Sequence, residues 1–254
     1  MPQAMEMQEK YGDQVQFLFV EAQGTAPSDT EKFVLQKSWI SDHAIWTNEQ
    51  PFETGARGIP HCVVLGIDGE VLINDNPMSA HGAIEAAIEA QLKLVKKGPK
   101  ELSAPLAKAW QDFEKGMYAT ALKSLDAIPE GPDKDAADKL SNTLTLRAKA
   151  KLNRLTWLIE AAEFDHADKL AAQLAKGMVG HELEEKVKEL STQLTAKEMA
   201  PEREAAKALD KVEKRMAKDG IDGGVLKGLK AVSEKFAQTR AGKRATHLAE
   251  LLGA

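Results

Sequence analysis

The residues best suited to chemistry lie in one short stretch, Gly58-Ile59-Pro60-His61-Cys62. Proline donates no backbone hydrogen bond and belongs at the first position of a strand, and an X-Pro bond adopts cis at a cost of about 0.5–1 kcal/mol. A cis proline there would turn the preceding backbone outward, so that the N–H and C=O of Ile59 could pair with an extended peptide. The alternative is that Pro60 is an ordinary trans residue at the start of a strand.

Cys62 is the single cysteine of the 254 residues. One thiol forms no intramolecular disulfide, dithiol couple or multi-cysteine zinc site. The apolar run His61–Ile67 predicts a strand, so we expect Cys62 to be a small hydrophobic residue facing one side of a sheet. Peroxidase chemistry through Cys62 is disfavoured, because a reactive thiolate needs a helix N-terminus or a cationic neighbour.

Other patterns give no catalytic or metal site. None of the six histidines is spaced for metal binding, and the chain holds no Gly-x-Ser-x-Gly elbow. Gly55-Ala56-Arg57-Gly58 precedes a predicted strand and not a helix, which argues against a phosphate loop. We therefore predict no metal and no cofactor.

The charge balance bears on which classes of partner the chain could bind. The chain has 34 Lys and Arg against 39 Asp and Glu, and the basic residues are spread among acids. This pattern does not favour nucleic acid. No apolar run approaches the ~20 residues of a membrane span, and the first ten residues lack the features of a signal peptide.

Composition shifts near residue 97. Residues 1–97 carry 14 acids and 7 basic residues, whereas residues 98–254 carry 25 and 27. The shift coincides with Lys96-Lys97-Gly98-Pro99, a helix stop in which glycine precedes proline. We predict two domains, 1–97 and 98–254.

The first domain alternates helices with strands. We expect a helix over 1–10, a buried strand over 15–20, and a short helix capped by Asp29 or Thr30. An extended stretch at 44–47 and strands at 61–67 and 71–74, joined by an Asp68-Gly69 turn, follow. A helix beginning at Ser79 or His81 closes the domain. The order indicates an α/β layer with mixed strands.

The second domain reads as helices alone, with apolar residues every three or four positions. The expected helices cover about 103–115, 118–128, 133–161, 163–177, 180–196, 201–218, 223–238 and 241–252. Residues 113–125 resemble the inter-helix turn of a tetratricopeptide unit, and residues 162–170 repeat its aromatic-x-x-Ala core without the glycine. The spacing from Tyr118 to Phe164 is 46 residues, which differs from the ~34-residue period of tetratricopeptide repeats. A degenerate tetratricopeptide-like array of helical hairpins is favoured over a true tetratricopeptide domain, and an irregular bundle remains the alternative.

The stretch GARGIPHCVVLGIDGEVL matches loop, strand, turn and strand in order and length. Residues 15–95 resemble the thioredoxin fold, most closely the redoxin branch of bacterial thiol–disulfide oxidoreductases. The resemblance implies that Pro60 is the cis-proline and that Ile59 contacts the substrate backbone. His61 stands where many members have a small hydroxyl residue. In that layout Trp39 and Trp46 flank the Pro60 region and are candidate walls of a groove, although core filling is the commoner role.

One departure from the family is large. Members of the family carry a Cys-x-x-Cys pair at the start of a helix, directly after a strand. This chain lacks both the pair and the strand, because it starts inside the corresponding helix, at Met1-Pro2. Without that strand, the strands at 15–20 and 61–67 would have unpaired edges or would pair with each other in an arrangement unusual for the fold. Either Met1 is internal to a longer protein, which we favour, or the chain is a redox-dead variant.

The fold expectation is therefore a thioredoxin-like α/β domain, lacking its first strand and cysteine pair, followed by an all-α helical-hairpin domain. The expected function is that of a redoxin in cell redox homeostasis, although the given sequence lacks the cysteine pair and would be redox-inactive. Substrate binding is expected at Ile59, Pro60 and His61. The expected partner is a protein thiol or disulfide. The alternative is a non-catalytic protein-binding scaffold. The compartment would be cytoplasmic if Met1 is the true start and periplasmic-type if the chain is truncated.

Overall fold

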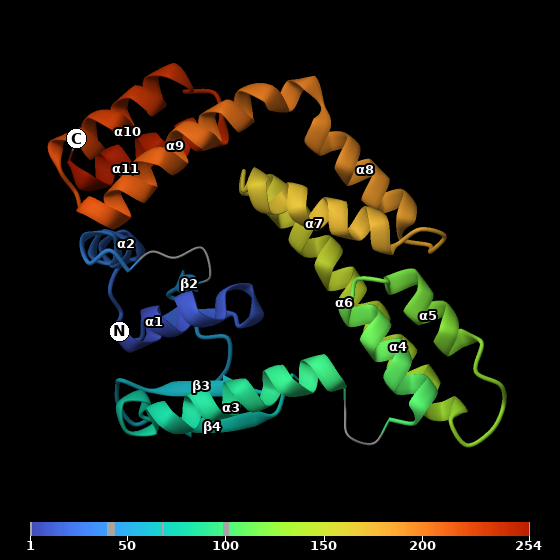
Figure 1. The fold of residues 1–254 in the computed structure, drawn as a ribbon. Helices are drawn as coiled ribbons and strands as arrows, with labels where there is room; N and C mark the ends of the chain where they lie inside the picture. Colours follow the sequence, from blue (N-terminus) through green and yellow to red (C-terminus); the bar gives the residue numbers. More distant parts are fainter. Residues whose placement is uncertain (1, 40–43, 68, 99–101, 254) are drawn as a thin grey trace. The chain divides into compact units, whose positions relative to one another are not determined.

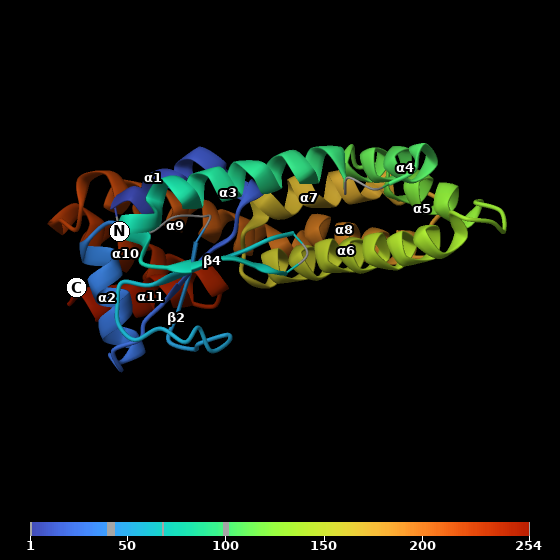
Figure 2. The same ribbon diagram turned by 90° about the horizontal axis from the view of Figure 1, so that it is seen from below.

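The computed structural model describes residues 2–39, 44–67, 69–98 and 102–253 (Figures 1 and 2). The chain divides into two compact units. One comprises residues 1–92 together with 207–254, and the other comprises residues 93–206. The predicted domain boundary at 98 stays a prediction.

The first part of the chain alternates helices and strands as expected. Its elements are α1 (Pro2–Tyr11), η1 (Gly12–Gln14), β1 (Phe17–Val20), α2 (Pro27–Gln36), β2 (Ala44–Thr47), β3 (Cys62–Leu65), β4 (Val71–Asp75) and α3 (Pro77–Lys97). The predicted cap of α2 is wrong. Its N-cap is Ala26, which makes no side-chain bond, and Pro27 starts the helix because its fixed φ suits the first turn.

The strands form two small sheets rather than one mixed sheet. β1 pairs in parallel with β2, from Phe17 opposite Ala44 to Val20 opposite Thr47. β3 pairs antiparallel with β4, and a bulge follows Val64. Within the described residues the two sheets are not hydrogen-bonded to each other, so the expectation of unpaired edges holds and that of a single mixed α/β layer is corrected. Asp68 of the predicted turn lies outside the described residues.

One helix layer covers both sheets. The buried residues of this layer come from α1 and α3, and side chains of both sheets pack on them. They are Met7, Tyr11, Ala80, Ile84 and Ile88, with Val15, Phe17, Cys62, Val64, Ile73 and Leu92 against them. Lys10 joins the two helices through ion pairs to Glu85 at 2.9 Å and Glu89 at 3.2 Å. The carboxylates raise the pKa of Lys10, so it stays charged.

The rest of the chain is helical, in close agreement with the eight predicted helices. The elements are α4 (Ala104–Glu114), α5 (Tyr118–Asp126), α6 (Lys134–Glu160), α7 (Phe164–Gly177), α8 (Glu184–Thr195), η2 (Lys197–Met199), α9 (Ala200–Asp219), α10 (Gly223–Lys235) and α11 (Arg240–Leu252). No described helix has the length and apolar character that crossing a membrane would require.

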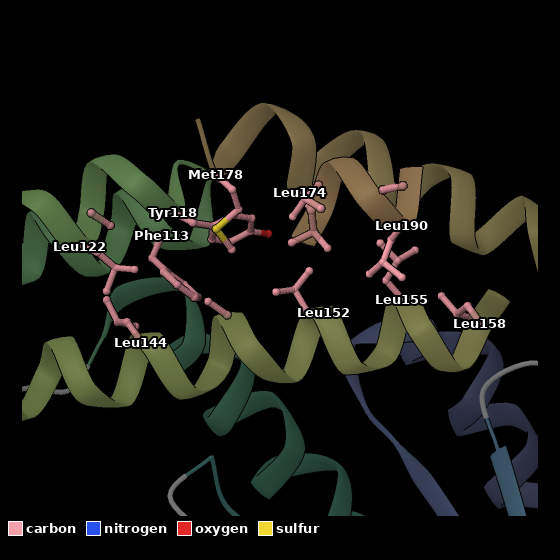
Figure 3. Close-up of a cluster of buried hydrophobic side chains, with 14 of the residues drawn as sticks. Phe113, Tyr118, Leu122, Leu144, Leu152, Leu155, Leu158, Leu174, Met178 and Leu190 are labelled. Atoms are coloured by element: carbon pink, nitrogen blue, oxygen red, sulfur yellow. The ribbon is translucent and has the colours of Figure 1, made fainter. Parts of the chain in front are cut away.

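The core of the second unit is built along α6. Figure 3 shows Leu144, Leu152, Leu155 and Leu158 of this helix facing side chains of α4, α5, α7 and α8. Leucines at spacings of three and eight lie toward one side of a helix, which is why α6 presents a continuous apolar stripe. The long helix α6 thus packs against both helical hairpins, α4–α5 and α7–α8.

Residues 207–254 add the end of α9 and the hairpin α10–α11 to the first unit. Asp222 caps α10 by accepting from the Val225 N–H at 2.7 Å, and Thr239 caps α11 by accepting from the Gly242 N–H at 3.0 Å. His247 of α11 lies 2.7 Å from the Glu31 carboxylate of α2.

Candidate functional site around the Ile59–His61 loop

The loop before β3 leaves Ile59 open to solvent. The Ile59–Pro60 peptide bond is cis, as the sequence analysis expects. The Ile59 side chain is 60% exposed, which is unusual for a large aliphatic residue. Among the described residues, none forms a hydrogen bond with the Ile59 N–H or C=O. The backbone and side chain of Ile59 are therefore both available to a partner.

His61 anchors this loop to the hairpin. Its Nε2 lies 2.5 Å from Oδ1 of Asn74 on β4, and Nδ2 of Asn74 donates to the Thr54 carbonyl at 3.0 Å. Asn74 thus links the start of β3 to the loop that begins near Thr54. Asn74 and Thr54 were not predicted from the sequence, because contacts across 13 and 20 residues leave no local pattern.

Cys62 is placed as the strand prediction implies. It is half-buried and packs on the α1–α3 layer. Burial raises the pKa of the thiol, and the nearby Asp75 carboxylate raises it further. A thiol with a raised pKa is a poor nucleophile at neutral pH, so Cys62 is not activated for exchange.

Trp39 and Trp46 lie in an aromatic stack of their own. Their rings are 6.5 Å apart and nearly parallel, Trp46 stacks on Phe19 at 4.7 Å, and Trp39 meets Phe33 edge-on at 5.5 Å. The Trp46 indole donates to the Trp39 carbonyl at 3.2 Å. Within the described part of the chain no ring contact or hydrogen bond joins this stack to Ile59–His61, and the role of Trp39 and Trp46 as groove walls stays a prediction.

The described residues contain no cluster of three or more potential metal ligands. Of the six histidines, His43 lies outside the described residues.

In the second unit, Arg203 lines a surface hollow, and its guanidinium is already hydrogen-bonded to neighbouring helices. It holds Asp168 through two bonds of 2.7 and 2.6 Å and donates to the Leu194 carbonyl. Arg203 therefore ties α7, α8 and α9 together and is not an open anion site.

The weak repeat of the sequence is a real structural repeat. Gly116 and Ala162 both have positive φ, of 83° and 62°. The following residues, Met117 and Glu163, share φ and ψ within a few degrees and each donates to a carbonyl five residues back at 2.9 Å. The same turn therefore joins α4 to α5 and α6 to α7. Ala162 adopts a conformation that normally favours glycine.

Comparisons with known proteins return no match. No protein-family model, no curated protein and no solved structure is similar to this chain. The function of this protein is therefore inferred from its residues and their geometry.

Proposed function

We propose that residues 1–97 bind an extended segment of a protein partner at the Ile59–His61 loop. In this proposal they are the docking part of a thioredoxin-like, redoxin-type module of the thiol–disulfide oxidoreductases. The supporting observation is the exposed Ile59, whose backbone N–H and C=O have no partner among the described residues, beside a loop fixed through His61 and Asn74. Exposed backbone groups next to an apolar side chain suit main-chain pairing with side-chain contact.

The sequence as given performs no thiol–disulfide exchange in this proposal. Exchange needs one thiolate to attack a disulfide and a second thiol to release the mixed disulfide. Cys62 is the only thiol, and burial raises its pKa. The partner's thiol or disulfide would react with a cysteine pair that this sequence does not contain.

Binding at the loop is tested with Ile59→Asp. The probe is reduced, S-carboxymethylated insulin B chain, an unfolded peptide that cannot exchange disulfides. We expect its affinity to fall at least about ten-fold, because a charge replaces an exposed apolar contact. The control is Met78→Asp on α3, where a 77% exposed side chain lies outside the loop. Equal affinity of the Ile59→Asp protein and the unchanged protein, measured by fluorescence anisotropy, would refute docking at this loop.

Insulin reduction by dithiothreitol tests the redox part. We expect the chain and its Cys62→Ser variant to leave the uncatalysed rate unchanged, because no activated thiolate is present. Acceleration that disappears in Cys62→Ser would show that Cys62 is active and would contradict the assignment.

A non-catalytic scaffold is the second candidate, and the repeated turn favours it. Helical hairpins that repeat one turn commonly bind peptides or proteins. On α6, Leu146 and Trp157 are 67% and 55% exposed, although the helix buries most of its other leucines. Probe binding that survives Ile59→Asp and is lost in Trp157→Ala would select this candidate.

A further inference from the structure

The edges of two short strands stand open in the first unit. Within residues 2–39, 44–67 and 69–98, β1 has only β2 as a hydrogen-bonded neighbour and β3 has only β4. Each of these inner strands therefore presents a row of backbone donors and acceptors on its other side. An edge of this kind is a template for a further strand.

Both open strands rest on the same helices. Phe17 of β1 and Cys62 and Val64 of β3 pack on the single layer formed by α1 and α3. The two small sheets thus share one supporting surface while they are not bonded to each other.

These edges lack basic side chains. Lysine is one of the residues with which proteins guard exposed strand edges. The segments that contain or flank the four strands, residues 13–21, 44–54 and 61–76, have no lysine or arginine. The acids of these segments whose side chains the structure describes are Glu21, Glu49, Glu53, Glu70 and Asp75.

The opposite face of the sheets is apolar and uncovered. Leu18 of β1, Ile45 of β2 and Leu65 of β3 are 42%, 47% and 47% exposed, and Val71 and Leu72 of β4 are 56% and 38% exposed. Apolar side chains that alternate along several adjacent strands normally lie under another element. The acidic flanks and the apolar face together define a complementary partner.

The supporting helix has an unfilled acceptor. Gln8 of α1 is 1% exposed, and its Oε1 has no hydrogen-bond partner among the described residues. Its Nε2 only reaches the Met5 sulfur, at 3.4 Å. A buried amide oxygen without a donor is unfavourable, and a hydroxyl group is the kind of donor that would satisfy it.

We propose that an extended segment of a partner protein, with alternating apolar residues and basic ends, adds as one strand between β1 and β3. Backbone groups of the segment pair with both edges, and its basic ends face the acids around the strands. The proposal does not depend on the Ile59 loop, because it uses different backbone groups.

The probe is the synthetic peptide Lys-Lys-Val-Thr-Val-Thr-Val-Lys-Lys. We expect it to slow amide hydrogen exchange in residues 17–20 and 62–65 together, while exchange in α4–α8 stays unchanged. A peptide with the central valine replaced by proline should bind at least about ten-fold more weakly, since proline interrupts strand pairing. A peptide with glutamates in place of the lysines should also bind more weakly.

Two variants localise the binding. Leu65→Lys places a lysine beside the β3 edge and should weaken binding at least about ten-fold, because lysine is the natural guard of edges. Met78→Lys adds the same charge on α3, away from both strand edges, and should leave the affinity within about two-fold. Circular dichroism of each variant checks that it is folded.

Three results would overturn the proposal. Protection of only one of the two strands would show that no single segment joins them. Equal binding of the proline peptide would show that pairing is not strand-like. A dimer in light scattering, with both strands protected before any peptide is added, would assign the edges to a second copy of this chain.

Discussion

Gly177→Ala should destabilise the helical unit by about 3 kcal/mol, at the upper end of what overpacking costs. Gly177 ends α7 against the turn between α4 and α5. A methyl group there would lie 2.6 Å from Cδ2 of Tyr118 and closer still to the Gly116 carbonyl oxygen. Tyr118 is 1% exposed and the carbonyl belongs to the backbone, so neither can move aside. Urea denaturation followed by circular dichroism measures the loss.

The matched control is Gly82→Ala in α3. Apart from its chain neighbours and the backbone of its own helix, no atom lies within 4 Å of a methyl group added at position 82. Alanine in a helix is favoured over glycine by about 0.5–1 kcal/mol, so this change should be neutral or stabilising. If Gly177→Ala were as benign as Gly82→Ala, the close approach of α7 to the α4–α5 turn would be refuted.

Leu144→Ala should lower the free energy of unfolding by about 3–5 kcal/mol. Leu144 of α6 is 0% exposed and faces the core in which Leu122 and Phe113 lie (Figure 3). Removing its methyl groups costs both their burial and the cavity that remains. The loss would appear as a lower urea midpoint with an unchanged slope.

Leu146→Ala is an unusually close control, because it makes the same change two residues along the same helix. Leu146 is 67% exposed, so its truncation should change stability by no more than about 0.5 kcal/mol. Equal effects of the two substitutions would mean that α6 is rotated about its axis relative to the structure.

Local signals predicted most elements but not their pairing. Gly98, Gly116 and Gly220 have positive φ and mark helix ends, which is why the sequence places those ends within a few residues. Strand pairing depends on residues far apart in the chain, and the segments alone do not specify it. The sequence therefore predicted the strands, whereas the two separate sheets appear only in the structure.

The candidate site was predicted in part for the same reason. Pro60 and Ile59 lie in a recognisable local pattern, whereas Asn74 meets His61 only after the hairpin folds back. Trp39 and Trp46 were candidate groove walls, but stacking on each other and on Phe19 was not predictable from their spacing. Ala162 has a positive φ because the surrounding turn imposes it, not because of its own preference.

Helix α6 serves two hairpins at once, and this couples their geometry. Its 27 residues span roughly 40 Å, with the first hairpin against its beginning and the second against its end. Inserting or deleting one residue midway would turn one end of α6 by about 100° relative to the other. The apolar side chains at that end would then no longer face the hairpin against which they pack. Length variation among natural variants should therefore accumulate in the connections at 127–133 and 178–183, while α6 keeps a constant number of residues.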